Sequence, residues 1–167
     1  MNLFLLRHGI AVEHGTAGFE KDADRPLTPK GERRLSRIAD AMEAMGLKFD
    51  LILSSPYARA RQTAEIVADV LGLKKKLEFS EDLTPGGDAK GLIVALNKRE
   101  PQPENVLLVG HEPFLSGLIA TLTCGDTRVS IDFKKGGLCK LEIETLRHAR
   151  CATLAWLLTP RQMGLMA

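Results

Sequence analysis

Three short polar clusters in the sequence carry side chains that could act on a phosphate group. They are Arg7-His8-Gly9, Ser54-Ser55-Pro56 and Gly110-His111-Glu112-Pro113, and an apolar run of residues precedes each. A histidine ring can serve as nucleophile or proton donor, and a guanidinium presents a planar fork of donors to phosphate oxygens. Arg59, shortly after the second cluster, could reach the same place. Together these residue types indicate a pocket for a dianion, and phosphate is the natural candidate.

The apolar runs before these clusters predict buried strands, with helical patterns between them. We expect strands at 2–7, 50–53, 77–79 and 105–110. We expect helices at 29–45, beginning after the cap Thr28, at 56–71, at 88–96 with Asp88 as cap, and at 113–122. The alternating stretches 137–145 and 151–158 predict an antiparallel hairpin at one sheet edge.

Alternating strands and helices predict an α/β fold, a three-layer α/β/α sandwich with a mostly parallel sheet and an antiparallel edge. No linker-like stretch breaks the chain, so we expect a single domain over residues 1–167. In open sheets of this class, ligands bind outside the carboxyl ends of the strands. The three polar clusters should therefore meet there, and two of them run into predicted helix N-termini, which favour anions.

The overall composition argues against several classes of function. A net charge of +2 points to neither nucleic acid nor an anionic membrane as partner. The three cysteines lie in apolar surroundings and form no CxxC pair, which predicts reduced core thiols in a cytoplasmic protein without a signal peptide. The sequence lacks the G-x-S-x-G and P-loop motifs, and an arginine beside His8 argues against a metal site. No cofactor is expected.

Other basic residues and histidines are more simply interpreted as surface positions. Arg33, Arg34 and Arg37 fall on the first predicted helix and should form its solvated face. His14 and His148 do not follow a buried strand and should lie in surface loops.

The three clusters also resemble the motifs of a known family. "LLRHGIA" resembles the Arg-His-Gly signature of the histidine phosphatase superfamily, also called the phosphoglycerate mutase-like family. "SSPYARARQTAE" is similar to its second motif, which starts at Ser55 and places its arginine at Arg59, and "VLLVGHEP" is similar to the third, with His111. The short length, "RPLTPKG" and "DLTPGGD" resemble the SixA-type phosphohistidine phosphatases within this superfamily.

The resemblance implies a phosphatase that works through a covalent phosphohistidine intermediate without a metal. His8 would attack phosphorus with an unprotonated ring nitrogen, while its other nitrogen donates to a backbone carbonyl that Gly9 brings close. Arg7 and Arg59 would hold the phosphate oxygens, and a protonated His111 would donate to them as charge develops.

Other positions follow from the resemblance less directly. Arg25 matches an arginine of the "RPLT" stretch and could add a phosphate contact, although a solvated residue before a helix cap is an equal alternative. Ser55 is a substrate-binding candidate as well as a turn residue. Many members carry a glutamate that protonates the leaving group; here "SEDLTPGGD" offers Asp82 or Glu81, and the choice between them stays open.

The expected substrate is phosphohistidine on a protein, such as a phosphorelay domain. Imidazole, with a pKa of about 6.5, leaves more readily than an alkoxide and needs less help from an acid. The alternatives are a phosphatase of small phosphorylated metabolites or of other phosphoproteins with the same nucleophile, a mutase, and a phosphoprotein-binding module without turnover.

Overall fold

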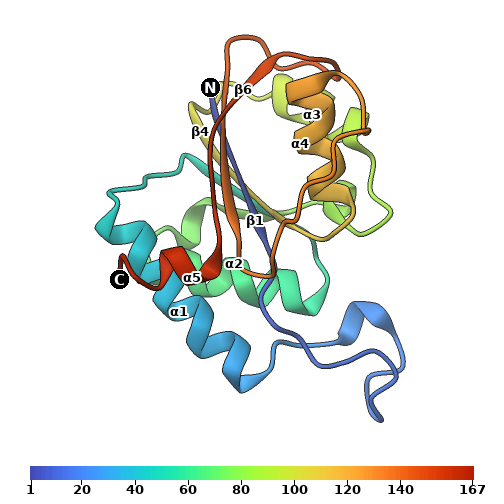
Figure 1. The fold of residues 1–167 in the computed structure, drawn as a ribbon, viewed down its shortest axis with the longest axis vertical. Helices are drawn as coiled ribbons and strands as arrows, with labels where there is room; N and C mark the ends of the chain where they lie inside the picture. The colour runs from blue at the N-terminus through green and yellow to red at the C-terminus, as the bar shows by residue number, and fades with distance from the viewer.

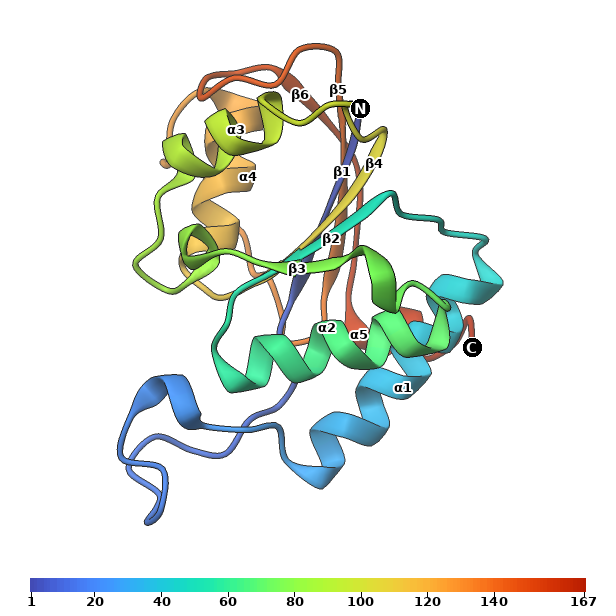
Figure 2. The same ribbon diagram turned by 180° about the vertical axis from the view of Figure 1, so that it is seen from behind.

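The computed structural model describes residues 1–167 and contains one six-stranded sheet and five α-helices. The strands are β1 (Asn2–Arg7), β2 (Leu51–Ser54), β3 (Leu77–Phe79), β4 (Asn105–Gly110), β5 (Leu138–Ile143) and β6 (Ala152–Leu158). The helices are α1 (Pro29–Ala44), α2 (Ala58–Val70), α3 (Ala89–Asn97), α4 (Phe114–Cys124) and α5 (Pro160–Met163). Helices cover both faces of the sheet (Figures 1 and 2).

The sheet has the strand order β3-β2-β4-β1-β5-β6. Strands β1 to β4 pair in parallel, whereas β5 runs antiparallel to β1 and to β6. This arrangement confirms the predicted α/β sandwich with a mostly parallel sheet and an antiparallel edge. Because β4 lies between β1 and β2, the carboxyl ends of these three strands are neighbours at one end of the sheet.

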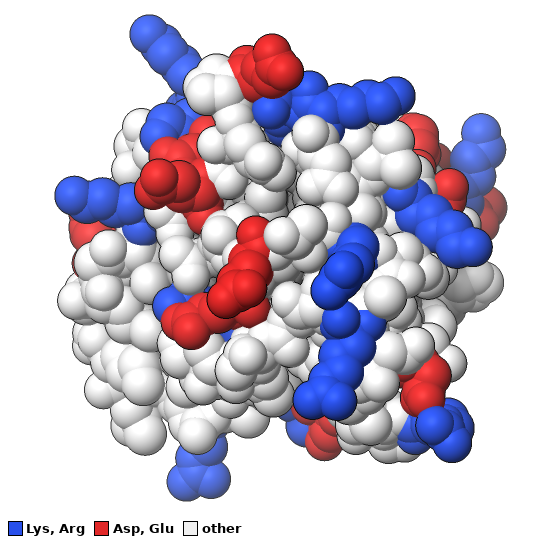
Figure 3. Space-filling view, turned by 90° about the horizontal axis from the view of Figure 1, so that it is seen from above, with Lys and Arg blue, Asp and Glu red and all other residues white.

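The two ends of the sheet differ in what they present. At the carboxyl end of β1, residues 8–28 form a long loop that projects from the body and leads into α1 (Figures 1 and 2). The opposite end, where β1 begins, carries Lys and Arg interspersed with Asp and Glu (Figure 3). This end of the molecule therefore has no surface of a single sign of charge that would attract an oppositely charged partner.

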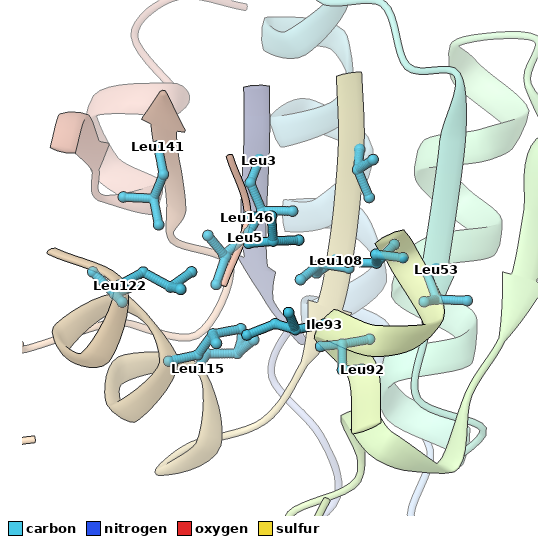
Figure 4. Packing of buried hydrophobic residues seen from close by; sticks show 14 of the residues in the cluster. Leu3, Leu5, Leu53, Leu92, Ile93, Leu108, Leu115, Leu122, Leu141 and Leu146 are labelled. Carbon is cyan, nitrogen blue, oxygen red and sulfur yellow. The ribbon is translucent and has the colours of Figure 1, made fainter. Parts of the chain in front are cut away.

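Each face of the sheet has its own apolar core. On one face, Leu5 of β1 and Leu108 of β4 pack with Leu92 of α3 and Leu115 of α4 (Figure 4). On the other face, alternate residues of the same strands pack against α1, α2 and α5. Strands covered on both sides must be apolar throughout, which is why the continuous runs in the sequence predicted them correctly.

The predicted helix caps at Thr28 and Asp88 are confirmed, because their side chains accept from the backbone N–H of Gly31 and Lys90. The predicted start of α2 at Pro56 is wrong: the helix begins at Ala58. The reason is local, since Ser55 Oγ accepts from the N–H of Tyr57, whose backbone is not helical (ψ 135°). Likewise α4 begins at Phe114, directly after Pro113.

All three cysteines are free, but they do not share one environment. Cys139 is buried in β5, and burial raises the pKa of its thiol to about 12, as expected for an unreactive core residue. Cys124 is exposed, so the prediction of a core thiol is wrong there; it ends α4, and the chain turns away at Gly125 (φ 90°). No helix is long and apolar enough to cross a membrane.

Candidate active site

The ends of β1, β4 and β2 bring the three polar clusters of the sequence together. The backbone N–H of His8 donates to Gly110 O over 3.1 Å, and that of Ser55 donates to Val109 O over 2.9 Å. These bonds extend the sheet ladder by one residue beyond each strand. The rings of His8 and His111 consequently lie with their centroids 5.0 Å apart. One phosphate group could contact both.

Both ring nitrogens of His8 have a hydrogen-bond partner in the site. Its Nδ1 lies 2.7 Å from Gly9 O, and Arg59 Nε donates to its Nε2 over 3.3 Å. A single tautomer satisfies both contacts, with the proton on Nδ1 and a lone pair on Nε2. Burial, followed by the nearby charges of His111 and the arginines, lowers the pKa of His8 well below 6.5 despite the Gly9 contact. The ring is therefore neutral at physiological pH.

Gly9 packs closely against the apolar side chains beside it. A Cβ at this position would lie 2.5 Å from Leu35 Cδ1 of α1 and 3.2 Å from Leu27 Cδ2. The N–H of Gly9 donates to Thr63 Oγ1 over 3.1 Å, and the same hydroxyl donates to Arg59 O over 2.7 Å. Thr63 thus links the His8 turn to the Arg59 helix, a role that its place in the apolar stripe of α2 did not predict.

Arg59 extends from the first turn of α2 into the site and is only 3% exposed. Its Nη1 donates to Asp22 O over 2.7 Å, and its Nη2 donates to Asp22 Oδ2 over 2.9 Å. Its guanidinium carbon lies 5.4 Å from the ring centroid of Tyr57. These contacts fix the fork of Arg59 beside both histidines without blocking all of its donors.

Asp22 is a site residue that the sequence did not reveal. It lies in a 3₁₀ turn (Asp22–Asp24) and bridges Arg59 and Arg25, whose Nη2 is 2.6 Å from Asp22 Oδ1. Partial burial raises the pKa of Asp22, but its hydrogen bonds to the two arginines outweigh this and hold it below the ordinary value. The spacing of Asp22 and Arg25, three residues apart, was the one available signal.

Arg25 lies at the rim of the site rather than among its central groups. Besides Asp22, it donates through Nη1 to Val12 O over 2.6 Å. It makes no hydrogen bond to His8 or His111. The arginine of the "RPLT" stretch therefore closes the loop onto the site through Asp22.

His111 is almost fully buried, at 1% exposure. Its Nε2 lies 2.9 Å from Ser55 Oγ, its Nδ1 has no partner, and its ring centroid is 5.3 Å from that of Tyr57. Burial, and then the charge of Arg59, lowers the pKa of His111 from 6.5 to about 3. The predicted protonated form of His111 is therefore not the one that this environment favours, because burial and the charges of three arginines outweigh the opposing charge of Asp22.

Arg7 completes the ring of basic groups from the end of β1. Its Nη1 donates to Phe133 O over 2.7 Å, and its Nε is buried without a partner. Burial lowers the pKa of Arg7, while Glu112 and Asp132 act in the opposite direction. The charge of Arg7 contributes to lowering the pKa of both His8 and His111, so its guanidinium lies on the same side as the two rings and Arg59. Guanidinium and imidazole groups gathered in this way suit a phosphate dianion.

The two acid candidates lie in the neighbouring turn Glu81–Leu83, not against the histidines. Asp82 Oδ2 accepts from Ser80 Oγ over 3.3 Å, and Glu81 is exposed. No hydrogen bond or ion pair joins either carboxylate to His8 or His111. The chain also contains no group of three or more His, Cys, Asp or Glu side chains placed to hold a metal ion.

The chain is similar in sequence and in fold to known proteins. A family model described as histidine phosphatase superfamily (branch 1) matches residues 3–93. The chain is 33% identical over 129 residues to the phosphohistidine phosphatase SixA of Escherichia coli, covering 76% of this chain and 77% of that protein. It is 38% identical over 142 residues to an uncharacterized protein of Picosynechococcus sp., with 84% of each covered.

A solved structure of the protein histidine phosphatase SixA complexed with tungstate superposes with a TM-score of 0.81 at 28% identity, covering 96% of this chain and 98% of that one. The sequence match and the shared fold extend over most of both molecules. The chain therefore belongs to the histidine phosphatase superfamily, within which its fold is that of the SixA-like phosphatases.

Proposed function

We propose that this chain is a metal-independent phosphatase that removes phosphate from histidine side chains of proteins, with His8 as nucleophile. The observation that carries the proposal is the state of His8: Nδ1 is tied to Gly9 O, and the lone pair of Nε2 faces Arg59. A buried, neutral imidazole between two guanidinium groups is poised to attack phosphorus.

In the proposed reaction, the Nε2 lone pair of His8 forms a bond to phosphorus while the P–N bond of the substrate breaks. The substrate ring, which carries a proton on its other nitrogen, leaves with that electron pair as a neutral imidazole. Water then attacks the phosphorus of phosphorylated His8, which releases inorganic phosphate and restores the neutral ring. Arg7 and Arg59 hold the non-bridging oxygens in both steps, and Ser55 lies within reach as a further donor.

His111 takes its role only when phosphate is present. A dianion beside the ring favours the charged imidazolium and so raises its pKa. His111 would then donate to an oxygen on which negative charge accumulates in the transition state. The low pKa that burial and the arginines give His111 is therefore compatible with its proposed role as a hydrogen-bond donor to phosphate.

The site suits a leaving group that departs without protonation by an acid. Asp22 is held ionised by its arginines, and neither Glu81 nor Asp82 is bonded to the histidines, so no protonated carboxyl group is in place. An alkoxide would need such an acid, whereas imidazole, with a pKa of about 6.5, does not. Phosphohistidine fits this requirement better than a phosphate ester does.

The connections around the site also favour a protein substrate. The links from β2 to α2 and from β4 to α4 take only residues 55–57 and 111–113, so no inserted segment covers the histidines from these sides. A site without inserted segments on these two sides can admit a side chain projecting from a folded partner, but it gives a free metabolite few contacts there.

The decisive experiment compares substrates at equal concentration: a phosphohistidine protein domain, a phosphotyrosine peptide, a phosphoserine peptide and a sugar phosphate. We expect the highest kcat/KM for the phosphohistidine domain, unchanged by a chelator. His8→Ala should abolish turnover, while an acid-labile phosphoenzyme accumulates only in the unsubstituted protein; His148→Ala, at an exposed loop position, is the matched control. A higher kcat/KM for the sugar phosphate would overturn the substrate, and full activity of His8→Ala would overturn the mechanism.

A further inference from the structure

A basic surface extends from the active site along α1, outside the groups that the proposed reaction uses. Two adjoining hollows of ≈ 530 and ≈ 730 Å³ share Arg34, Pro160 and Arg161. The smaller one also includes Arg7 in its wall, so it shares this residue with the candidate active site. Seven cations other than Arg7 line these hollows, and one of them, Lys134, is paired with Asp132. We define the basic trough by the remaining six: Lys30, Arg33, Arg34, Arg37, Lys135 and Arg161.

The charges of the basic trough are not neutralised within the chain. None of its six cations forms an ion pair, and no aspartate or glutamate lines either hollow. Arg37 donates to the backbone oxygen of Gly164 over 3.0 Å, and Lys134 at the rim is paired with Asp132. The opposite end of the sheet, by contrast, mixes both signs of charge (Figure 3).

The basic trough is electrostatically continuous with the catalytic groups. Partial burial lowers the pKa of Lys135, and the charges of Arg7, Arg25 and Arg59 lower it further. The backbone supports this proximity, since Gly136, the next residue, donates to Arg7 O over 2.9 Å. A ligand in the trough is thus adjacent to a phosphate held by Arg7.

The dimensions of the basic trough exceed those of a small phosphorylated metabolite. Lys30, Arg33, Arg34 and Arg37 recur at helical spacing along one side of α1, from which they extend over about 10 Å of helix axis. The trough also has an apolar component, because Leu165, which lines the larger hollow, is 82% exposed. Cations beside an exposed leucine suit a protein surface that combines carboxylates with an apolar contact, rather than a nucleic acid backbone.

We propose that the basic trough docks a carboxylate-rich surface of the phosphohistidine protein, next to its phosphorylated histidine. This inference rests on the function proposed above and names the partner surface that the site recognises. Complementary charge would speed encounter and fix the orientation in which the phosphohistidine enters the site. The arginines of α1, which the sequence alone assigns to a solvated helix face, acquire a specific role.

The test is the charge-reversal variant R34E/R161E. Both side chains are exposed and make no hydrogen bond, so the fold should be unaffected. The matched control is K75E/K98E, which reverses two exposed, unpaired lysines elsewhere on the surface. Each variant is assayed on a phosphohistidine protein domain and on phosphoramidate, a small compound with a P–N bond.

For R34E/R161E we expect kcat/KM on the protein domain to fall about tenfold or more, through KM, with kcat and the rate on phosphoramidate unchanged. Raising the salt concentration from about 0.15 M to about 0.5 M should lower kcat/KM on the protein domain for the unsubstituted protein and the control. The kcat/KM of R34E/R161E should change little. An unchanged kcat/KM on the domain would overturn the docking surface alone. An equal loss on phosphoramidate would show that these arginines act on phosphate itself, which also overturns it.

Failure of the proposed function gives a different pattern from failure of the docking surface. If the unsubstituted protein hydrolyses phosphoramidate or a sugar phosphate but no phosphohistidine domain, the proposed substrate and the proposed docking surface are both wrong. If it hydrolyses the domain and R34E/R161E does so equally well, the substrate proposal stands and only the docking surface is wrong.

Discussion

Acid should destabilise this protein through its active-site histidines, because the fold buries both rings without charge. The pKa of His111 is lowered from 6.5 to about 3, chiefly by burial, and that of His8 also lies well below 6.5. As the pH falls below 6.5, the unfolded chain binds protons at these positions but the folded protein does not. The free energy of unfolding therefore falls with pH until the folded pKa is reached. For His111 alone, the loss between about pH 7 and about pH 5 is about 2 kcal/mol.

Urea denaturation at both pH values measures this loss, with His111→Asn as the variant that cannot titrate. We expect the variant to lose about 2 kcal/mol less than the unsubstituted protein between about pH 7 and about pH 5. The comparison uses the change with pH, so a general destabilisation by the substitution does not affect it. His148→Asn, at an exposed position, should lose as much as the unsubstituted protein. An equal pH-dependent loss in His111→Asn would refute the reasoning.

Three further substitutions test the architecture of the site. Gly9→Ala should lower the free energy of unfolding by about 1–3 kcal/mol, because the added Cβ meets Leu35. In a Leu35→Val background the same substitution should cost less. Equal costs in the two backgrounds would refute the contact. Thr63→Val should cost about 1–3 kcal/mol in urea denaturation, because it leaves the Gly9 N–H unpaired, whereas Thr63→Ser should restore stability. Asp22→Asn should tighten the binding of inorganic phosphate severalfold in calorimetry, because it removes a negative charge bonded to Arg59; unchanged or weaker binding would contradict this.

The sequence predicted the layers of the fold because burial on both faces leaves a plain signal. The continuous apolar runs of β1, β2 and β4 can only be strands covered on both sides, and the helices between them set the parallel order. From that order alone, the polar groups at the strand ends had to meet at one end of the sheet. The proximity of His8 and His111 is a consequence of topology rather than of any local motif.

The contacts made by the loop before α1 could not be predicted in the same way. Residues 13–25 have no period, and whether Asp22 turns toward Arg59 depends on how the loop folds back over α2. The start of α2 was missed for a related reason, since Ser55 competes for the N–H of Tyr57 through a short side-chain contact. The charge state of His111 depends on both burial and neighbouring arginines, neither of which a linear sequence displays.

The contacts of Arg59 and the two histidines indicate how phosphate would change the site. Arg59 Nε donates to the lone pair of His8 Nε2, which attacks phosphorus in the proposed mechanism, so binding of phosphate would have to draw Arg59 away from that nitrogen. Asp22 already holds the other two nitrogens of the guanidinium from the opposite loop, which limits how far the side chain can move. A phosphate dianion offers oxygens to the Nε–H that Arg59 now directs at His8, and the exchange replaces a neutral acceptor by a charged one. The same charge raises the pKa of His111 while the Gly9 carbonyl keeps the Nδ1 proton of His8 in place. In this scheme the pKa of both histidines is lowered by burial, yet the two rings take opposite roles because only His8 is anchored through Nδ1.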